Sequence, residues 1–73
     1  MYAMTVVKDC LHALDTMEAA PTDFEANVLE TVTRQCQQGR VPSVKQHRVL
    51  CDMVLKYLDD PALLRAMQEE MPA

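Results

Sequence analysis

Two helix-start signals and one helix-stop signal mark residues 22–58 as a helical hairpin. The first start signal is Thr22 with Glu25. In such a capping box the threonine hydroxyl accepts a hydrogen bond from the amide three residues later, and the glutamate accepts one from the threonine amide. The stop signal is Gly39, the single glycine of the chain, because helices commonly end at a residue in the left-handed conformation. A helix is therefore predicted over 23–38.

The second start signal follows a few residues later. Ser43 and Gln46 repeat the capping-box pattern, and Pro42 disfavours helix at the residue before it. A second helix is therefore predicted over 44–58. Because the connection is short, we expect the two helices to pack antiparallel or at a steep angle.

Periodicity and capping residues predict one further helix on each side of the hairpin. Over 3–18 the apolar side chains recur in alternating steps of four and three, at Ala3, Val7, Cys10, Leu14 and Met17. After the hairpin, Asp60 is a favourable N-cap and Pro61 suits the first helical position, which predicts a short helix over 61–70. The predicted fold is all-α, a bundle of three longer helices and a short C-terminal one, in a single domain over 1–73.

Apolar stripes indicate which faces of these helices form the core. Over 23–38 the stripe consists of Phe24, Val28, Val32 and Cys36. Over 44–58 it is wider and consists of Val44, His47, Leu50, Cys51, Val54, Tyr57 and Leu58. On the short helix it consists of Leu63, Leu64, Met67 and Met71. A wide stripe indicates contact with more than one neighbour, so the helix over 44–58 is predicted to be central.

The length of 73 residues limits how much apolar surface the domain buries. A chain of this size buries only about 60% of the surface that it exposes when unfolded. The chain has no tryptophan, so its core must come mainly from aliphatic, methionine and cysteine side chains. We therefore expect marginal stability, which a partner or weak self-association would raise.

Cysteine usage and hydropathy predict a cytoplasmic protein. Three cysteines, an odd number, without a basic-then-apolar N-terminal segment argue against a secreted disulfide framework. No apolar run approaches the roughly 18 residues that a membrane-spanning helix needs, so no membrane association is expected.

Charge is divided unevenly along the chain. Residues 31–51, which we call the basic segment, hold four basic side chains and no acidic one, a net charge of +4. The remainder holds three basic and eleven acidic side chains, a net charge of −8. The four cations are Arg34, Arg40, Lys45 and Arg48. The dipole of the first hairpin helix favours basic groups near its C-terminal end, but Lys45 lies at the start of the next helix, where a dipole disfavours it. These four residues are the candidate partner-binding site.

Two kinds of partner fit the basic segment. In a helix-turn-helix the first residues of the second helix enter the DNA major groove, and here they are Ser43, Lys45, Gln46 and Arg48, which can contact phosphates and base edges. The length of both hairpin helices and the acidic remainder of the chain argue against DNA. An acidic patch on a partner protein is the interpretation that the charge balance favours.

Cysteine and histidine are the candidates for chemistry. His47 and Cys51 are four residues apart on one predicted helix face, and Cys10, His12 and Cys36 could converge on them in a metal site. The other candidate is a cysteine nucleophile with His47 as its base. However, no closely spaced cysteine pair is present, and the cysteines fall on apolar stripes, where a free cysteine packs as a small hydrophobe. We therefore predict no metal, no cofactor and no catalytic residue.

Six methionines lie mostly toward the two ends of the chain. They are predicted to belong to the core or to the chain ends. The alternative is that Met4, Met67 and Met71 form an adaptable apolar surface for a partner, because the flexible thioether adapts to varied shapes.

The hairpin resembles sequences found in bacteriophages and other mobile elements. The run 24–46, with its Gly-Arg-x-x-Ser-x-Lys-Gln turn over 39–46, is similar to hairpins in small phage proteins and protein tails, although Pro42 stands where a leucine is commoner. Length and acidic balance are also similar to those of phage inhibitors of host RNA polymerase. The resemblance implies a non-enzymatic cytoplasmic protein that binds a host protein complex, with RNA polymerase as the partner it suggests.

Overall fold

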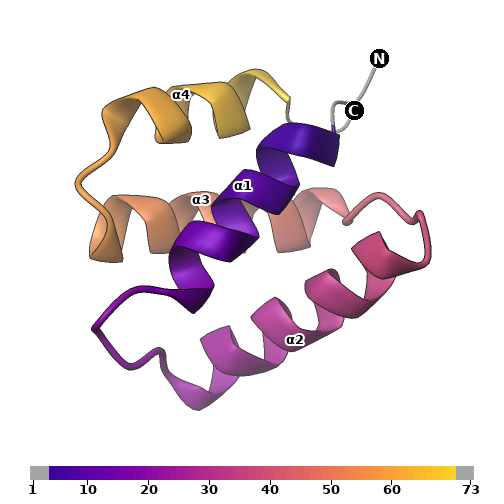
Figure 1. Cartoon of the computed structure of the whole chain (residues 1–73), viewed down its shortest axis with the longest axis horizontal. Coiled ribbons are helices and arrows are strands. Elements are labelled where there is room, and N and C mark those ends of the chain that lie inside the picture. The colour runs from indigo at the N-terminus through magenta and orange to yellow at the C-terminus, as the bar shows by residue number, and fades with distance from the viewer. Residues whose placement is uncertain (1–3, 71–73) are drawn as a thin grey trace.

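Residues 4–70 fold into four α-helices, three of which start at the predicted capping residues. The computed structural model describes residues 4–70, and its helices are α1 (Met4–Asp15), α2 (Asp23–Gln37), α3 (Val44–Tyr57) and α4 (Pro61–Glu69) (Figure 1). No strand occurs among the described residues. The predicted all-α fold of three longer helices and a short fourth is confirmed.

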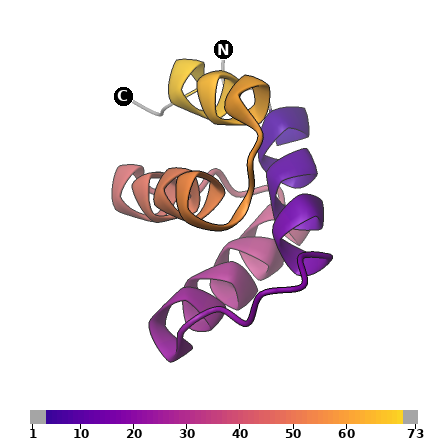
Figure 2. The ribbon, with the colours of Figure 1, turned by 90° about the vertical axis from the view of Figure 1, so that its left-hand side faces the viewer.

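Helix α3 is central, as its wide apolar stripe predicted. It packs against α1, α2 and α4, whereas α2 and α4 do not contact each other. In Figure 1, α4 and α2 lie on opposite sides of α3, and Figure 2 shows α1 crossing all three on one side. The fold is therefore a layer of three helices in the order α4, α3, α2, with α1 lying across one face of that layer.

Gly39 ends α2 in a backbone conformation that suits glycine. Its φ is +76°, and no other described residue has a positive φ. The amide of Arg40 donates to the carbonyl of Gln35 at 2.8 Å, and the amide of Gly39 donates to the carbonyl of Cys36 at 3.0 Å. These two hydrogen bonds are those of a Schellman motif, so the predicted helix stop is confirmed.

Side-chain caps begin the next helices as predicted. Both capping boxes are complete: the amide of Thr22 donates to Glu25 at 2.8 Å, and the amide of Ser43 donates to Gln46 at 2.9 Å. Asp60 caps α4 by accepting from the amide three residues later at 3.0 Å. Each cap satisfies backbone donors that a helix start would otherwise leave unpaired.

One continuous core joins the four helices. Its fully or nearly fully buried apolar side chains are Val7, Cys10, Leu11, Leu14, Val32, Cys36, Leu50, Cys51, Met53, Val54 and Met67. Helices α1 and α3 supply four of these residues each, whereas α2 supplies only Val32 and Cys36. Helix α2 is therefore the most peripheral of the three longer helices.

Helix α1 ends earlier than the pattern predicted. The predicted range was 3–18, but the helix ends at Asp15, and residue 3 lies outside the described residues. The hydroxyl of Thr16 donates to the carbonyl of His12 at 3.0 Å and to that of Ala13 at 3.2 Å, which closes the last turn. Met17 keeps its predicted contact with the core from the following loop.

Phe24 is not in the core, which corrects the predicted stripe of α2. Its side chain is 60% exposed, whereas Val28 is half-buried and Val32 is fully buried. Burial thus increases toward the C-terminal end of α2, because α2 and α3 converge at the turn and diverge at the other end of the hairpin (Figure 1). The apolar period of a helix shows which face is turned inward but not how far the neighbouring helix extends along it.

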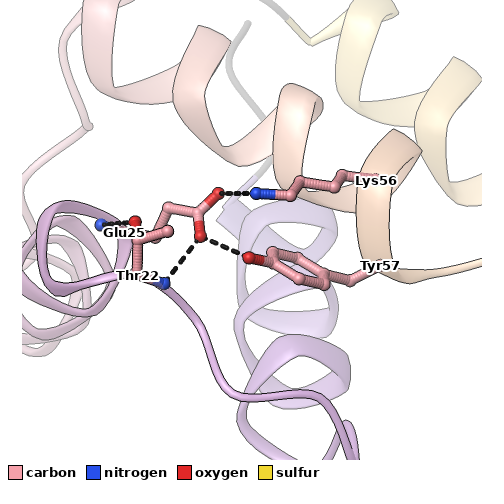
Figure 3. A network of polar contacts seen from close by, with 4 residues as sticks. All are labelled: Thr22, Glu25, Lys56 and Tyr57. Carbon is pink, nitrogen blue, oxygen red and sulfur yellow. Dashed lines mark hydrogen bonds and ion pairs between the residues drawn. The ribbon is translucent and has the colours of Figure 1, made fainter.

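A polar contact joins the divergent end of the hairpin. The carboxylate of Glu25 accepts a hydrogen bond from the hydroxyl of Tyr57 at 2.5 Å and forms an ion pair with Lys56 at 3.5 Å (Figure 3). The same carboxylate completes the cap at Thr22. One side chain therefore closes the start of α2 and ties it to the end of α3.

Met67 lies inside the molecule, which argues against the adaptable methionine surface. Its side chain is fully buried in the core, where α4 packs against the other helices. Met4 is half-buried against the core, and Met71 lies outside the described residues. Because α4 packs against both α1 and α3, its apolar side is used internally.

Candidate binding surface

Three of the four cations of the basic segment lie at or just after the connection from α2 to α3. Arg40 lies in the turn between α2 and α3, and Lys45 and Arg48 lie in the first turns of α3. All three side chains are exposed. Lys45 and Arg48 are three residues apart on a helix, so they lie next to each other on one face.

Local structure holds this cationic group in place. The Schellman motif at Gly39 determines where Arg40 leaves α2, and the capping box of Ser43 determines where α3 starts. Pro42, between them, is buried and has a restricted φ. Arg40 therefore lies in a short connection whose two ends are both fixed by hydrogen bonds, and Lys45 and Arg48 lie on the helix that follows.

Arg40, Lys45 and Arg48 form no ion pair within the described residues, although Asp52 follows Arg48 by one turn of α3. The ion pairs there join Arg34 to Glu30, Lys56 to Glu25 and Arg65 to Glu69, and none involves Arg40, Lys45 or Arg48. Three exposed cations of the basic segment thus have no ion pair, in a chain whose other regions are strongly acidic. Such a patch attracts an acidic partner and steers its approach.

Arg34 lies apart from the other three cations. Its guanidinium is 3.1 Å from Glu30, one turn earlier on α2, and both side chains are largely exposed. Both residues line an open groove of about 550 Å³ between α2 and the C-terminal end of α1 with its loop, where Leu14 and Leu29 contribute apolar surface. Arg34 is therefore on the α1 side of the molecule.

The face of α3 turned away from α1 extends the cationic group. Lys45, Arg48, Asp52 and Leu55 follow one another in steps of three, four and three, which places them on one stripe, and all four are exposed. We call these four residues the open face of α3. None of the described helices covers it, because all four side chains are exposed. Helix α1 lies across one face of the layer (Figure 2).

Two apolar residues near the cations were not predicted as surface features. Leu55 is 71% exposed, and Val41, in the turn before α3, is 47% exposed. The sequence carries a signal for Leu55, because it is an apolar residue that falls outside the core stripe of α3. The sequence carries no comparable signal for Val41, because residues in a turn follow no helical periodicity from which an exposed apolar residue would depart.

His47 is a structural residue in the core. It is fully buried, and its Nε2 lies 2.5 Å from the backbone carbonyl oxygen of Met67. Because a carbonyl only accepts, this nitrogen carries the proton and donates. The imidazole thus ties α3 to α4 rather than facing a substrate site. His12, the other histidine, is exposed on α1.

The three cysteines are free and buried. Burial raises the pKa of Cys10 to about 12, with a contribution from nearby Cys51, and burial also raises the pKa values of Cys36 and Cys51. These thiols are therefore protonated at neutral pH, whereas nucleophiles and metal ligands are thiolates. Within residues 4–70, no three His, Cys, Asp or Glu side chains are grouped so that they could hold a metal ion.

Two further findings complete the description of the chain. In the part that the structure describes, every helix is too short or too polar to cross a lipid bilayer. Comparisons with protein-family models, with curated proteins and with solved structures gave no match to this chain.

Proposed function

We propose that this protein is a small non-enzymatic regulator that acts in the cytoplasm by binding another protein through its basic segment. The observation that supports this most directly is the group formed by Arg40, Lys45 and Arg48. These are three exposed cations without an ion pair among the described residues, in a chain of net charge −4. If acidic and basic side chains were evenly mixed over the surface, no such group of cations would remain.

The partner that this surface fits is a protein with an acidic patch. The resemblance of the hairpin to phage proteins suggests a host complex, and bacterial RNA polymerase is the first candidate. A protein partner tolerates the acidic remainder of this chain, because it needs to be complementary only where the two surfaces touch.

Direct readout of DNA is the less favourable alternative. The side chains of Ser43 and Gln46 are engaged in the capping box of α3, which leaves only Lys45 and Arg48 of the expected recognition residues. Two cations supply little of the charge neutralisation on which DNA affinity depends, and the rest of the chain repels phosphate.

Binding to purified bacterial RNA polymerase tests the proposal. We expect the double variant Lys45→Ala/Arg48→Ala to bind more weakly than the wild type, mainly through slower association, because rim charges steer the encounter. The matched control is Lys8→Ala/Arg65→Ala, which removes two exposed cations from α1 and α4. Equal weakening by both variants would show that net charge alone matters. Absence of binding to the polymerase would reject this partner.

Duplex DNA provides the second arm of the experiment. We expect weak binding to random duplex DNA even at low salt. The contrary result is submicromolar binding at about 150 mM salt with a log-log salt slope of about −0.9 for each phosphate contacted. If the variant Arg40→Ala/Lys45→Ala/Arg48→Ala abolished such binding, the protein would be a nucleic-acid-binding module instead.

A further inference from the structure

We infer that the open face of α3 binds an acidic amphipathic helix of the partner protein, with acidic side chains on Lys45 and Arg48 and an apolar side chain on Leu55. This inference rests on the proposed function, because it specifies which part of a protein partner occupies the surface. It adds an apolar contact to the electrostatic one, and it specifies that the bound segment of the partner is a helix.

The first step is the arrangement of charge and apolar surface along α3. The two cations occupy the first turns of the helix, and Leu55, which is 71% exposed, lies near its C-terminal end. From Lys45 to Leu55 the helix advances ten residues, which is about 15 Å at 1.5 Å per residue. A partner helix lying along this face would contact Lys45 and Arg48 with an acidic turn and Leu55 with an apolar turn about 15 Å away.

The second step is the position of Asp52 between Arg48 and Leu55. Its carboxylate is exposed on the same stripe and forms no ion pair among the described residues. A uniformly negative ligand, such as a nucleic-acid backbone following the face, would meet this charge and be repelled. A peptide whose acidic side chains are confined to one end places no negative charge next to Asp52, so this repulsion does not arise. The face therefore favours a peptide with separate acidic and apolar parts.

The third step is the absence of an internal use for Leu55. The neighbouring residues Val54 and Leu58 pack against the core, whereas Leu55 is largely exposed and lines a small hollow at the connection from α3 to α4. An exposed leucine on a stripe with two unpaired cations gives a partner apolar area to bury beside the charges. Its burial would supply the affinity that exposed charges alone supply poorly.

Two synthetic helical peptides of about 18 residues would test the inference against the full chain. Both carry the same glutamates at one end, and they differ only at the other end, where one has leucines and the other has serines. We expect the leucine peptide to bind about tenfold more tightly, which is the effect of burying roughly one leucine side chain. Backbone amide shifts in the protein are expected along α3, not along the groove beside α2.

Variants separate the two parts of the surface. Leu55→Ser, which changes no charge, is expected to remove the preference for the leucine peptide, whereas the matched variant Phe24→Ser, at an exposed apolar residue of α2, is expected to keep it. Lys45→Ala/Arg48→Ala is expected to weaken binding of both peptides. Circular dichroism of each variant establishes that the fold is intact.

Contrary outcomes are distinguishable. If Leu55→Ser kept the preference, or the two peptides bound equally while the charge variant still weakened both, the apolar contact would be rejected and the proposed function would stand. If the charge variant changed neither the peptides nor the polymerase, the proposed function would itself be rejected. Amide shifts confined to the groove beside α2 would also overturn the inference.

Discussion

Glu25 shows how one residue can serve local and tertiary structure together. Its carboxylate accepts hydrogen bonds from the hydroxyl of Tyr57 and the amide of Thr22, and it pairs with Lys56 (Figure 3). These donors favour the charged form, the tyrosine hydroxyl most strongly, and they lower the pKa of Glu25 from 4.5 to about 2. The capping role is readable from sequence, but the contact with α3 is not.

The lowered pKa makes stability depend on pH in acid. Because the folded-state pKa of Glu25 is below its unfolded value, its contribution is fully present above about pH 4.5 and is lost as the pH falls toward about 2. Glu25→Gln lacks this titration. The difference in free energy of unfolding between wild type and variant is therefore expected to shrink over that range, measured by urea denaturation at several pH values. A constant difference would contradict the role of the carboxylate.

At the scale of the helix, the end of α2 depends on a single backbone conformation. Gly39 has φ of +76°, and a Cβ added there would meet no atom within 4 Å. Any cost of a side chain at this position is therefore conformational strain and not a steric clash with another part of the protein.

The substitution Gly39→Ala is expected to destabilise the protein by about 1 kcal/mol, because alanine is strained in the left-handed region. The measurement is the thermal or urea unfolding midpoint by circular dichroism. Gln38→Ala is the control, since Gln38 is exposed and has a negative φ of −90°. Equal stability of Gly39→Ala and the wild type would show that α2 does not need the left-handed residue.

For the molecule as a whole, α4 is stabilised mainly by its contacts with the other helices. It has nine residues, too few for a stable isolated helix in water. Its fully buried Met67 packs into the common core, and the carbonyl of the same residue accepts from His47 of α3. Helix α4 therefore depends on its packing against α1 and α3.

The substitution Met67→Ala is expected to cost about 2–5 kcal/mol, because it removes a fully buried side chain and leaves a cavity. That is a large share of the roughly 5–15 kcal/mol by which small domains are stable. Leu55→Ala, at a side chain that is 71% exposed, is expected to change the free energy of unfolding by less than about 0.5 kcal/mol. Similar losses for the two variants would contradict the packing of α4 described above.

The sequence by itself determined the four helices and those of their ends that carry a capping residue or glycine. Capping residues such as Thr22, Ser43 and Asp60 interact with backbone groups only three residues away, so their effect is local. The same holds for Gly39 at the end of α2. Helix α1 ended earlier than predicted. The hydroxyl of Thr16 donates to the carbonyls of His12 and Ala13 in its last turn, and the apolar period carries no signal for these hydrogen bonds.

Only the tertiary structure decided which side chains are covered. It left Phe24 exposed although Phe24 belongs to the apolar stripe of α2, and it turned Arg34 toward the groove beside α1. Residue spacing shows which side chains share a helix face. What lies against that face depends on the angles at which helices cross, and many side chains from all four helices set those angles together.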